Sequence, residues 1–392
     1  QDQDSHFKVH IDHLADMADG KINVGESLGP RPADLEDALC ELALAGPGIC
    51  ALRALRRVAP DLDSSDPILL TASARISSGF RSLFNLPETI ALLRGSGDGA
   101  YWRLTLKYGL DGNIQSVLDE YVHVLLDSLG LQDKNSYERI DKISESVLKA
   151  LSLKTSKISI DSIVRVNHGF KVDSFPSRAR FALRLEDIRG GDEDKDIDRV
   201  EDVQAAFNSP FRPFILASTS IGQEGLDFHT WCHSVTHWNL PSNPVDLEQR
   251  EGRVHRYKGH AVRKNVADLY GLSSLPKDDK NSDPWRTLFQ LATESKPAGL
   301  SDLVPFWIFE GKYHVERRVP LLPFSKDIKK FDRLKRALAL YRMVFGQPRQ
   351  EDLLSSLENQ PEVGSAQRSE LFISLRPPVA TSSGDRDGND SN

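Results

Sequence analysis

Apolar side chains recur at helical spacing along most of the first 172 residues. Within each of several segments they return every three to four positions, which places them on one face of a helix. These segments are residues 51–58, 76–84, 89–93, 114–129 and 143–151. We therefore predict a mainly helical region over residues 1–172.

The pattern changes from about residue 173. Helical spacing at residues 197–207 and 246–256 separates short apolar segments that have the length of strands. Asn243 and Pro244 stand where the second of these helices would begin. The strand candidates are residues 179–185, 214–217, 234–238 and 265–270. Such an alternation predicts an α/β fold in which helices flank a parallel sheet.

The rest of the chain returns to helical patterns and then becomes polar. Residues 285–292 show a short helical pattern, and residues 328–344 show a strongly amphipathic one. We expect a helical extension over residues 273–365. Beyond it the chain is rich in Ser, Gly and Asp, which predicts a disordered tail over residues 366–392.

Composition adds a few limits to this picture. The chain has 392 residues, which is enough for two or three domains. Its net charge is -7. No apolar run approaches the roughly 20 residues of a membrane-spanning helix, so we expect no membrane partner. Its three cysteines form no CxxC pair, which argues against a zinc ribbon or a disulfide framework and is typical of a cytoplasmic protein.

Charge is unevenly distributed along the chain. Residues 249–264 carry six Arg or Lys against one acid, whereas residues 186–202 carry nine acids against three bases. A local basic patch attracts phosphates even in an acidic chain. The basic run therefore marks the place where a phosphate-bearing partner would bind.

That basic run opens on the octapeptide 249–256, Gln-Arg-Glu-Gly-Arg-Val-His-Arg. If it is helical, Arg253 and Arg256 lie on one face, and Gly252 allows another surface to approach closely. A pair of guanidinium groups suits a polyphosphate whose charge grows during transfer. An arginine in that role is worth roughly 10³ to 10⁵ in rate.

A second unusual run, residues 218–227, follows the predicted strand 214–217. Ligands of a parallel sheet bind at the carboxyl ends of its strands. Thr219 offers a hydroxyl group and an amide to a phosphate, Gly225 permits a tight turn, and Asp227 can accept from a ribose or an arginine. An ordinary strand-to-helix turn rich in small residues is the structural alternative.

The order and spacing of these two runs resemble motifs V and VI of superfamily 2 helicases and translocases. The similarity is closest to the Swi/Snf-like branch, and it covers about residues 210–270. Trp238-Asn239 and Asn243-Pro244 stand, in altered form, where that branch has Pro-Trp-Asn-Pro. The resemblance implies that residues 173–272 form a second RecA-like domain, with motifs V and VI, and that residues 1–172 are a helical insertion or accessory region.

The resemblance also implies site residues. Arg253 and Arg256 would reach the ATP phosphates as catalytic arginines, and Gln249 would position the attacking water or the phosphate. The residues implied on the nucleotide side are Gly225, Asp227 and Gly252. The residues implied to contact nucleic acid are Ser218, Thr219, Lys258 and Arg263. For the last two, a solvated basic edge remains an equal alternative.

Two motifs of a complete motor are absent from the sequence. No phosphate loop of the form Gly-x-x-x-x-Gly-Lys-Ser/Thr occurs, and no Asp-Glu-x-His box for Mg²⁺ occurs. Residues 119–123 come nearest, and a solvated acidic pair explains them better. We therefore expect ATP and Mg²⁺ to be held mainly by an upstream RecA-like domain, and the chain alone to be inactive.

The sequence thus predicts the C-terminal lobe of an ATP-dependent nucleic-acid helicase or translocase. Its expected nucleic-acid partner is double-stranded DNA, bound through backbone phosphates. A non-catalytic RecA-like module that binds nucleic acid or protein is one alternative. A motor subunit of a restriction or phage-defence complex is another, although no cluster with nuclease spacing occurs.

Overall fold

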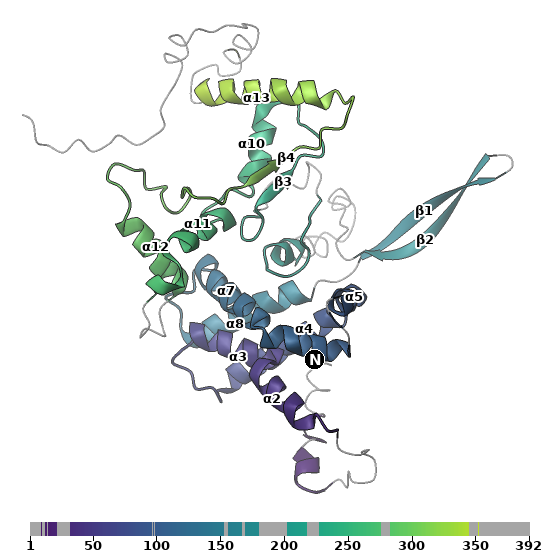
Figure 1. Cartoon of the computed structure of the whole chain (residues 1–392), viewed down its shortest axis with the longest axis vertical. Helices are drawn as coiled ribbons and strands as arrows, with labels where there is room; N and C mark the ends of the chain where they lie inside the picture. The colour runs from purple at the N-terminus through teal and green to yellow at the C-terminus, as the bar shows by residue number, and fades with distance from the viewer. Residues whose placement is uncertain are drawn as a thin grey trace, which may run out of the picture.

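The computed structural model describes most of the chain. The described residues are 9, 12–13, 15–21, 32–95, 97, 99–152, 156–166, 169–179, 202–217, 227–275, 283–344 and 352. They form a helical bundle, a long hairpin and a mixed C-terminal part (Figure 1). Helices dominate among these residues, and the two sheets that they form are each two-stranded.

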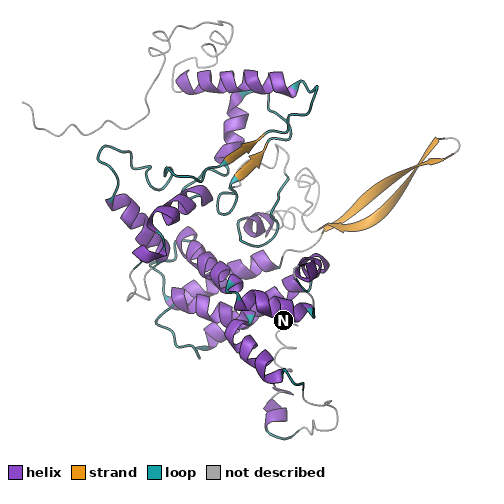
Figure 2. Ribbon diagram, in the orientation of Figure 1, coloured by secondary structure: helices purple, strands orange, loops and turns teal. Residues whose placement is uncertain are grey.

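The N-terminal part is a bundle of helices, as predicted (Figure 2). Its members are α2 (Leu35–Ala45), α3 (Pro47–Val58), α4 (Pro67–Phe84), α5 (Pro87–Gly95), α6 (Tyr101–Leu110), α7 (Asn113–Ser128) and α8 (Ser136–Leu151). Leu55, Leu69, Leu118 and Ile140 are completely buried in its core. These apolar residues follow the helical period, so burial of one face of each helix holds the bundle together.

We expected no apolar run close to the length of a membrane-spanning helix, but the first two helices of the bundle contain one. Leu35–Val58 has the length and the hydropathy of a membrane-spanning helix, by length and composition only. Gly46 and Pro47 divide it into α2 and α3. Ala54 and Leu55 of α3 are fully buried in the bundle, and core helices pass the same hydropathy test.

A long antiparallel hairpin follows the bundle and projects from the rest of the molecule (Figure 1). β1 (Ser156–Val166) pairs with β2 (Gly169–Ala179), with Ile163 opposite Val172. The helical prediction was therefore wrong over residues 156–166 and 169–172. β-branched residues crowd this segment, and they favour strands over helices. The predicted strand 179–185 overlaps β2 only at Ala179, and its other residues lie outside the described part.

The C-terminal part contains a short parallel pair of strands and several helices. β3 (Ser234–Thr236) pairs with β4 (Glu316–Arg318), and Ser234 lies opposite Glu316. The helices are α10 (Pro244–Gly252), α11 (His260–Tyr270), the 3-10 turn Leu272–Ser274, α12 (Pro284–Glu294) and α13 (Asp327–Val344). Helices were predicted at 246–256, 285–292 and 328–344, and α10, α12 and α13 cover most of these residues. Of the predicted helix 197–207, residues 202–207 are described, and they are helical.

Parallel strand pairing is limited to β3 and β4 among the described residues. Two predicted strands are absent. Residues 214–217 form no strand, and Phe214 and Ile215 are 74% and 85% exposed. Residues 265–270 belong to α11, because Val262 and Val266 share a buried helical face. The larger sheet of the predicted α/β fold is therefore not seen in the described residues.

Candidate functional site

The two sequence runs meet at Asp227. Residues 218–226 lie outside the described part of the chain, so the structure gives no positions for Ser218, Thr219 and Gly225. Asp227 is described, and its carbonyl oxygen accepts hydrogen bonds from Asn208 Nδ2 at 2.7 Å and Gln204 Nε2 at 3.3 Å. The end of the first run is thus held by the preceding helical segment.

Helix α10 leads directly into the arginine segment. Asn243 caps it by accepting from the backbone amide of Asp246 at 2.8 Å, and Pro244 occupies its first turn. The helix ends at Gly252, so Arg253 and Arg256 lie in the turns after it. The expectation that both arginines share one helical face was therefore wrong.

After this turn, the side chain of Arg256 forms an ion pair with Asp227. Nε of Arg256 donates to Oδ1 of Asp227 at 3.0 Å, and a second guanidinium nitrogen lies 2.9 Å from the same oxygen. The side chains of Arg256 and Asp227 remain 36% and 41% exposed. In the backbone, the amide of Phe228 donates to the carbonyl oxygen of Arg253 at 2.8 Å. The ends of the two runs therefore lie side by side, and both charged groups are open to solvent.

The other predicted residues of the octapeptide have simpler surroundings. Gln249 is exposed on α10, and Arg253 is half-buried. A Cβ atom on Gly252 would meet nothing within 4 Å. A close approach at this glycine would therefore have to come from a surface other than the described residues.

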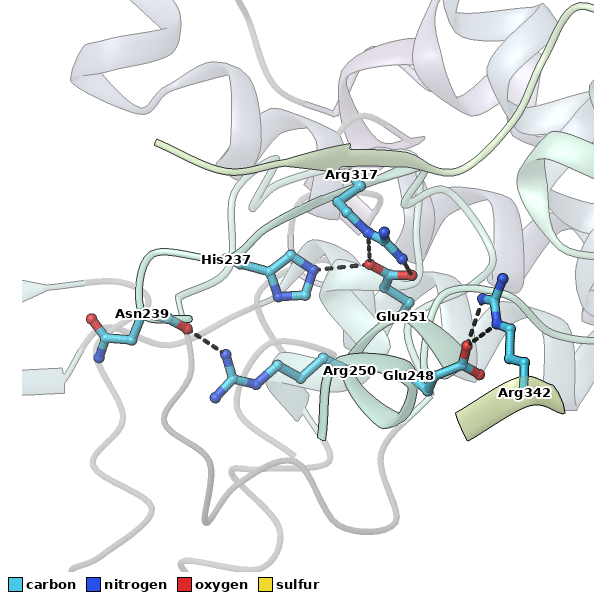
Figure 3. Close-up of polar contacts among 7 residues, drawn as sticks. All are labelled: His237, Asn239, Glu248, Arg250, Glu251, Arg317 and Arg342. Carbon is cyan, nitrogen blue, oxygen red and sulfur yellow. Dashed lines mark hydrogen bonds and ion pairs between the residues drawn. The ribbon is translucent and has the colours of Figure 1, made fainter. Parts of the chain in front are cut away.

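Glu251, which the sequence reading left without a role, connects three elements (Figure 3). His237 Nε2 donates to its carboxylate at 3.1 Å, and Arg317 of β4 donates to it at 2.6 Å. Burial raises the pKa of Glu251, but the hydrogen bonds from His237 and Arg317 outweigh this and lower the pKa to about 2. As the lone acid in a basic run, Glu251 offered a sequence signal for this role.

Arg250 and Glu248 of α10 make further polar contacts with neighbouring segments (Figure 3). Arg250 Nη1 donates to the carbonyl oxygen of Asn239 at 2.7 Å. Arg342 of α13 donates to Glu248 at 2.6 Å. The helix that carries the octapeptide is thus tied to the segment after β3, to β4 and to α13, and these contacts set where its C-terminal end lies.

Lys258 and Arg263, which were expected to contact nucleic acid, both lie in largely internal surroundings. Nζ of Lys258 lies 2.8 Å from both carboxylate oxygens of Asp127, and the lysine side chain is 12% exposed. Arg263 is 5% exposed and lies over the rings of Trp231 and Trp285. Burial lowers the pKa of Arg263 to about 10. Both cations therefore serve internal packing in this arrangement.

A cavity of about 610 Å³ opens beside the arginine turn. It lies between this turn, α11 and residues 307–315, and its volume is within the usual range for small-molecule sites. Its lining includes Arg256, His255, Trp307, Tyr313 and His314. His255 donates through Nε2 to the carbonyl oxygen of Trp307 at 3.0 Å, so this histidine closes one wall of the cavity.

The described residues contain no group of three or more His, Cys, Asp or Glu that could hold a metal ion. Cys40, Cys50 and Cys232 are all free thiols. The described site offers the half-exposed guanidinium group of Arg256 and the carboxylate of Asp227.

Two comparisons with known proteins point to helicases. Residues 161–258 match the family model of the helicase conserved C-terminal domain. The uncharacterized ATP-dependent helicase YqhH of Bacillus subtilis (strain 168) is 27% identical to the chain over 161 residues. That match covers 39% of this chain and only 25% of the relative. No solved structure matches the chain. Together, the two matches support the presence of a helicase C-terminal domain in this chain.

Proposed function

We propose that the chain is the C-terminal lobe of an ATP-dependent nucleic-acid helicase or DNA translocase. Within this proposal, residues 173–272 form the second RecA-like domain of a superfamily 2, Swi/Snf-like motor. ATP and Mg²⁺ are held mainly by an upstream RecA-like domain, and Arg253 and Arg256 reach the phosphates across the gap between the lobes. The helicase family match and the helicase relative support the general class.

The ion pair between Arg256 and Asp227 is the observation that carries this proposal. Both side chains are more than a third exposed, and a solvent-exposed ion pair is worth only about 0–1 kcal/mol. A phosphate offers Arg256 two charge-assisted hydrogen bonds in a site that excludes water. Arg256 can therefore leave Asp227 for a nucleotide at little cost when the lobes close.

The remaining residues would divide between the nucleotide and the nucleic acid. Gln249, exposed on α10, would position the attacking water or the phosphate. Gly225, Asp227 and Gly252 would lie on the nucleotide side. Ser218 and Thr219 would contact the backbone of double-stranded DNA, which makes binding sensitive to salt and largely independent of sequence.

The test is DNA-stimulated ATP hydrolysis by the full-length protein that carries this chain. Arg256→Ala is expected to lower turnover by about 10³-fold or more, because the charge that forms in the transition state loses its partner. Arg318→Ala is the matched control, since Arg318 is an exposed arginine paired with Glu316 in the same part of the chain. Turnover of Arg256→Ala within about twofold of wild type would favour a non-catalytic module instead.

A further inference from the structure

Helix α7 of the bundle contacts the turn that carries Arg256. Asp127 lies in the last turn of α7, and both of its carboxylate oxygens lie 2.8 Å from Nζ of Lys258. The two side chains are 24% and 12% exposed. The rings of Phe289 and Phe306 lie 4.9 and 5.9 Å from the same nitrogen. This ion pair is far more enclosed than the pair of Arg256 and Asp227.

Each partner of this pair is unfavourable in its own local structure. A carboxylate in the last turn of a helix faces the negative end of the helix dipole, which is the position of Asp127. Lys258 has a φ of 49°, in the left-handed region that non-glycine residues rarely adopt. The contact between the two side chains offsets both costs, so it helps to hold the conformation of the turn.

The backbone of Lys258 is connected to Arg256 through a short network. Its amide donates to the carbonyl oxygen of Phe306 at 2.7 Å, and its carbonyl oxygen accepts from Nη1 of Arg263 at 2.9 Å. The amide of Gly259 donates to the carbonyl oxygen of Arg256 at 3.0 Å. Displacement of Lys258 would therefore move the backbone from which the Arg256 side chain extends.

The same helix also packs against the C-terminal part at its middle. The ring of Tyr121 meets the rings of Phe211 and Trp231 edge to face, at centroid distances of 5.6 and 5.4 Å. The guanidinium group of Arg263 lies 5.4 Å from the centroid of the Trp231 ring. Helix α7 thus touches the C-terminal part at two separate places, so the bundle supports the region that carries the arginine turn.

We propose that Asp127 is a positioning residue for Arg256. Through Lys258 it holds the turn in the conformation from which Arg256 reaches the nucleotide, so the helical bundle takes part in setting the catalytic geometry. This inference rests on the proposed function, because it assigns a support to the same arginine. Asp127 itself touches no reacting atom.

The first test is the turnover of the full-length protein with Asp127→Asn. Turnover at saturating ATP should fall by about 10- to 100-fold, since a small misplacement of a catalytic group is that costly, while the KM for ATP changes little. Asp127→Glu, which keeps the charge, should restore most of the loss. Asp133→Asn removes an exposed carboxylate from the loop after α7 and should leave turnover unchanged.

The double variant Asp127→Asn/Arg256→Ala separates positioning from general damage. If Asp127 acts through Arg256, its substitution has no further effect once Arg256 is gone, so the double variant matches Arg256→Ala alone. An equal factor of loss in both backgrounds would overturn the proposal. Lys258→Met, which removes the same ion pair from its other side, should reproduce the effect of Asp127→Asn.

Hydrogen exchange on the 392-residue chain gives a readout that does not need ATP turnover. Asp127→Asn should raise the exchange rates of the Lys258 and Gly259 amides by about tenfold or more, while amides in α4 keep their rates. If Arg256→Ala leaves turnover intact, the proposed function fails, and faster exchange still shows that Asp127 holds the turn. Unchanged exchange at both amides would overturn the proposal by itself.

Discussion

Arg256 and Glu251 lie a few residues apart, and their surroundings give them opposite properties. Arg256 pairs with the carboxylate of Asp227, and solvent reaches both side chains, so Arg256 can exchange partners. Glu251 accepts from both His237 and Arg317 and is only 20% exposed. Removing one partner of such a pair destabilises the fold, because a partly buried charge is left without an opposite charge. Arg256 can therefore exchange its partner, whereas Glu251 is held by two partners at once.

The depressed pKa of Glu251 predicts a pH-dependent contribution to stability. Its pKa falls from 4.5 to about 2 in the folded chain, so the stabilisation is full above pH 4.5 and is lost as the pH falls toward 2. Glu251→Gln should lower the free energy of unfolding by about 2 kcal/mol at pH 7, after a discount for partial exposure. Urea unfolding of both proteins from pH 7 downward measures the difference, which should shrink below pH 4.5.

Glu248→Gln on the same helix is the control for this measurement. Its partner Arg342 is 63% exposed, and an exposed pair contributes at most about 1 kcal/mol. A gap between wild type and Glu251→Gln that does not change between pH 7 and pH 3 would contradict the assignment of this carboxylate.

At the scale of elements, α10 was predictable because its local signals agree. Asn243, Pro244 and the spacing of apolar residues all indicate a helix start at the same place. Residues 214–217 carried one signal only, their apolar content, and Phe214 and Ile215 turn out to be exposed. The hairpin of β1 and β2 was missed because its apolar residues also fit a helical period over short stretches.

The cap of α10 gives a prediction at this scale. Asn243→Ala should lower the free energy of unfolding by about 1 kcal/mol, because the Asp246 amide loses its acceptor. Asn243→Asp keeps an acceptor oxygen at the helix start and should stay close to wild type. Thermal or urea unfolding of the three proteins decides this, and equal losses for both substitutions would contradict a capping role.

At the scale of the whole molecule, the bundle and the C-terminal part share one core. Phe211 belongs to the cluster of buried bundle residues, and its ring meets those of Phe80 and Tyr121 edge to face. Sequence patterns cannot reveal such a contact, since it joins residues far apart in the chain. They single out the arginines and Asp227 as candidates, but not Glu251, Asp127 and Lys258, whose contacts depend on tertiary packing.

This shared core predicts the effect of removing one ring. Phe211 is 7% exposed, so Phe211→Ala should lower the free energy of unfolding by about 3–5 kcal/mol through lost burial and a new cavity. Phe214→Ala is the matched control, because Phe214 is 74% exposed, and it should cost less than about 0.5 kcal/mol. Urea unfolding of the 392-residue chain measures the free energy of unfolding of both variants. Similar small losses for the two variants would mean that the bundle and the C-terminal part are not joined through Phe211.

Arg256 is proposed to act on a nucleotide held outside this chain. The most direct measurement is single-turnover hydrolysis of bound ATP by the full-length protein with saturating double-stranded DNA, since it separates chemistry from binding. We predict that Arg256→Ala slows this step by about 10³-fold or more and that Arg256→Lys recovers little of it, because lysine lacks the guanidinium fork. Hydrolysis by Arg256→Ala within about twofold of the wild-type rate would rule out this role of Arg256.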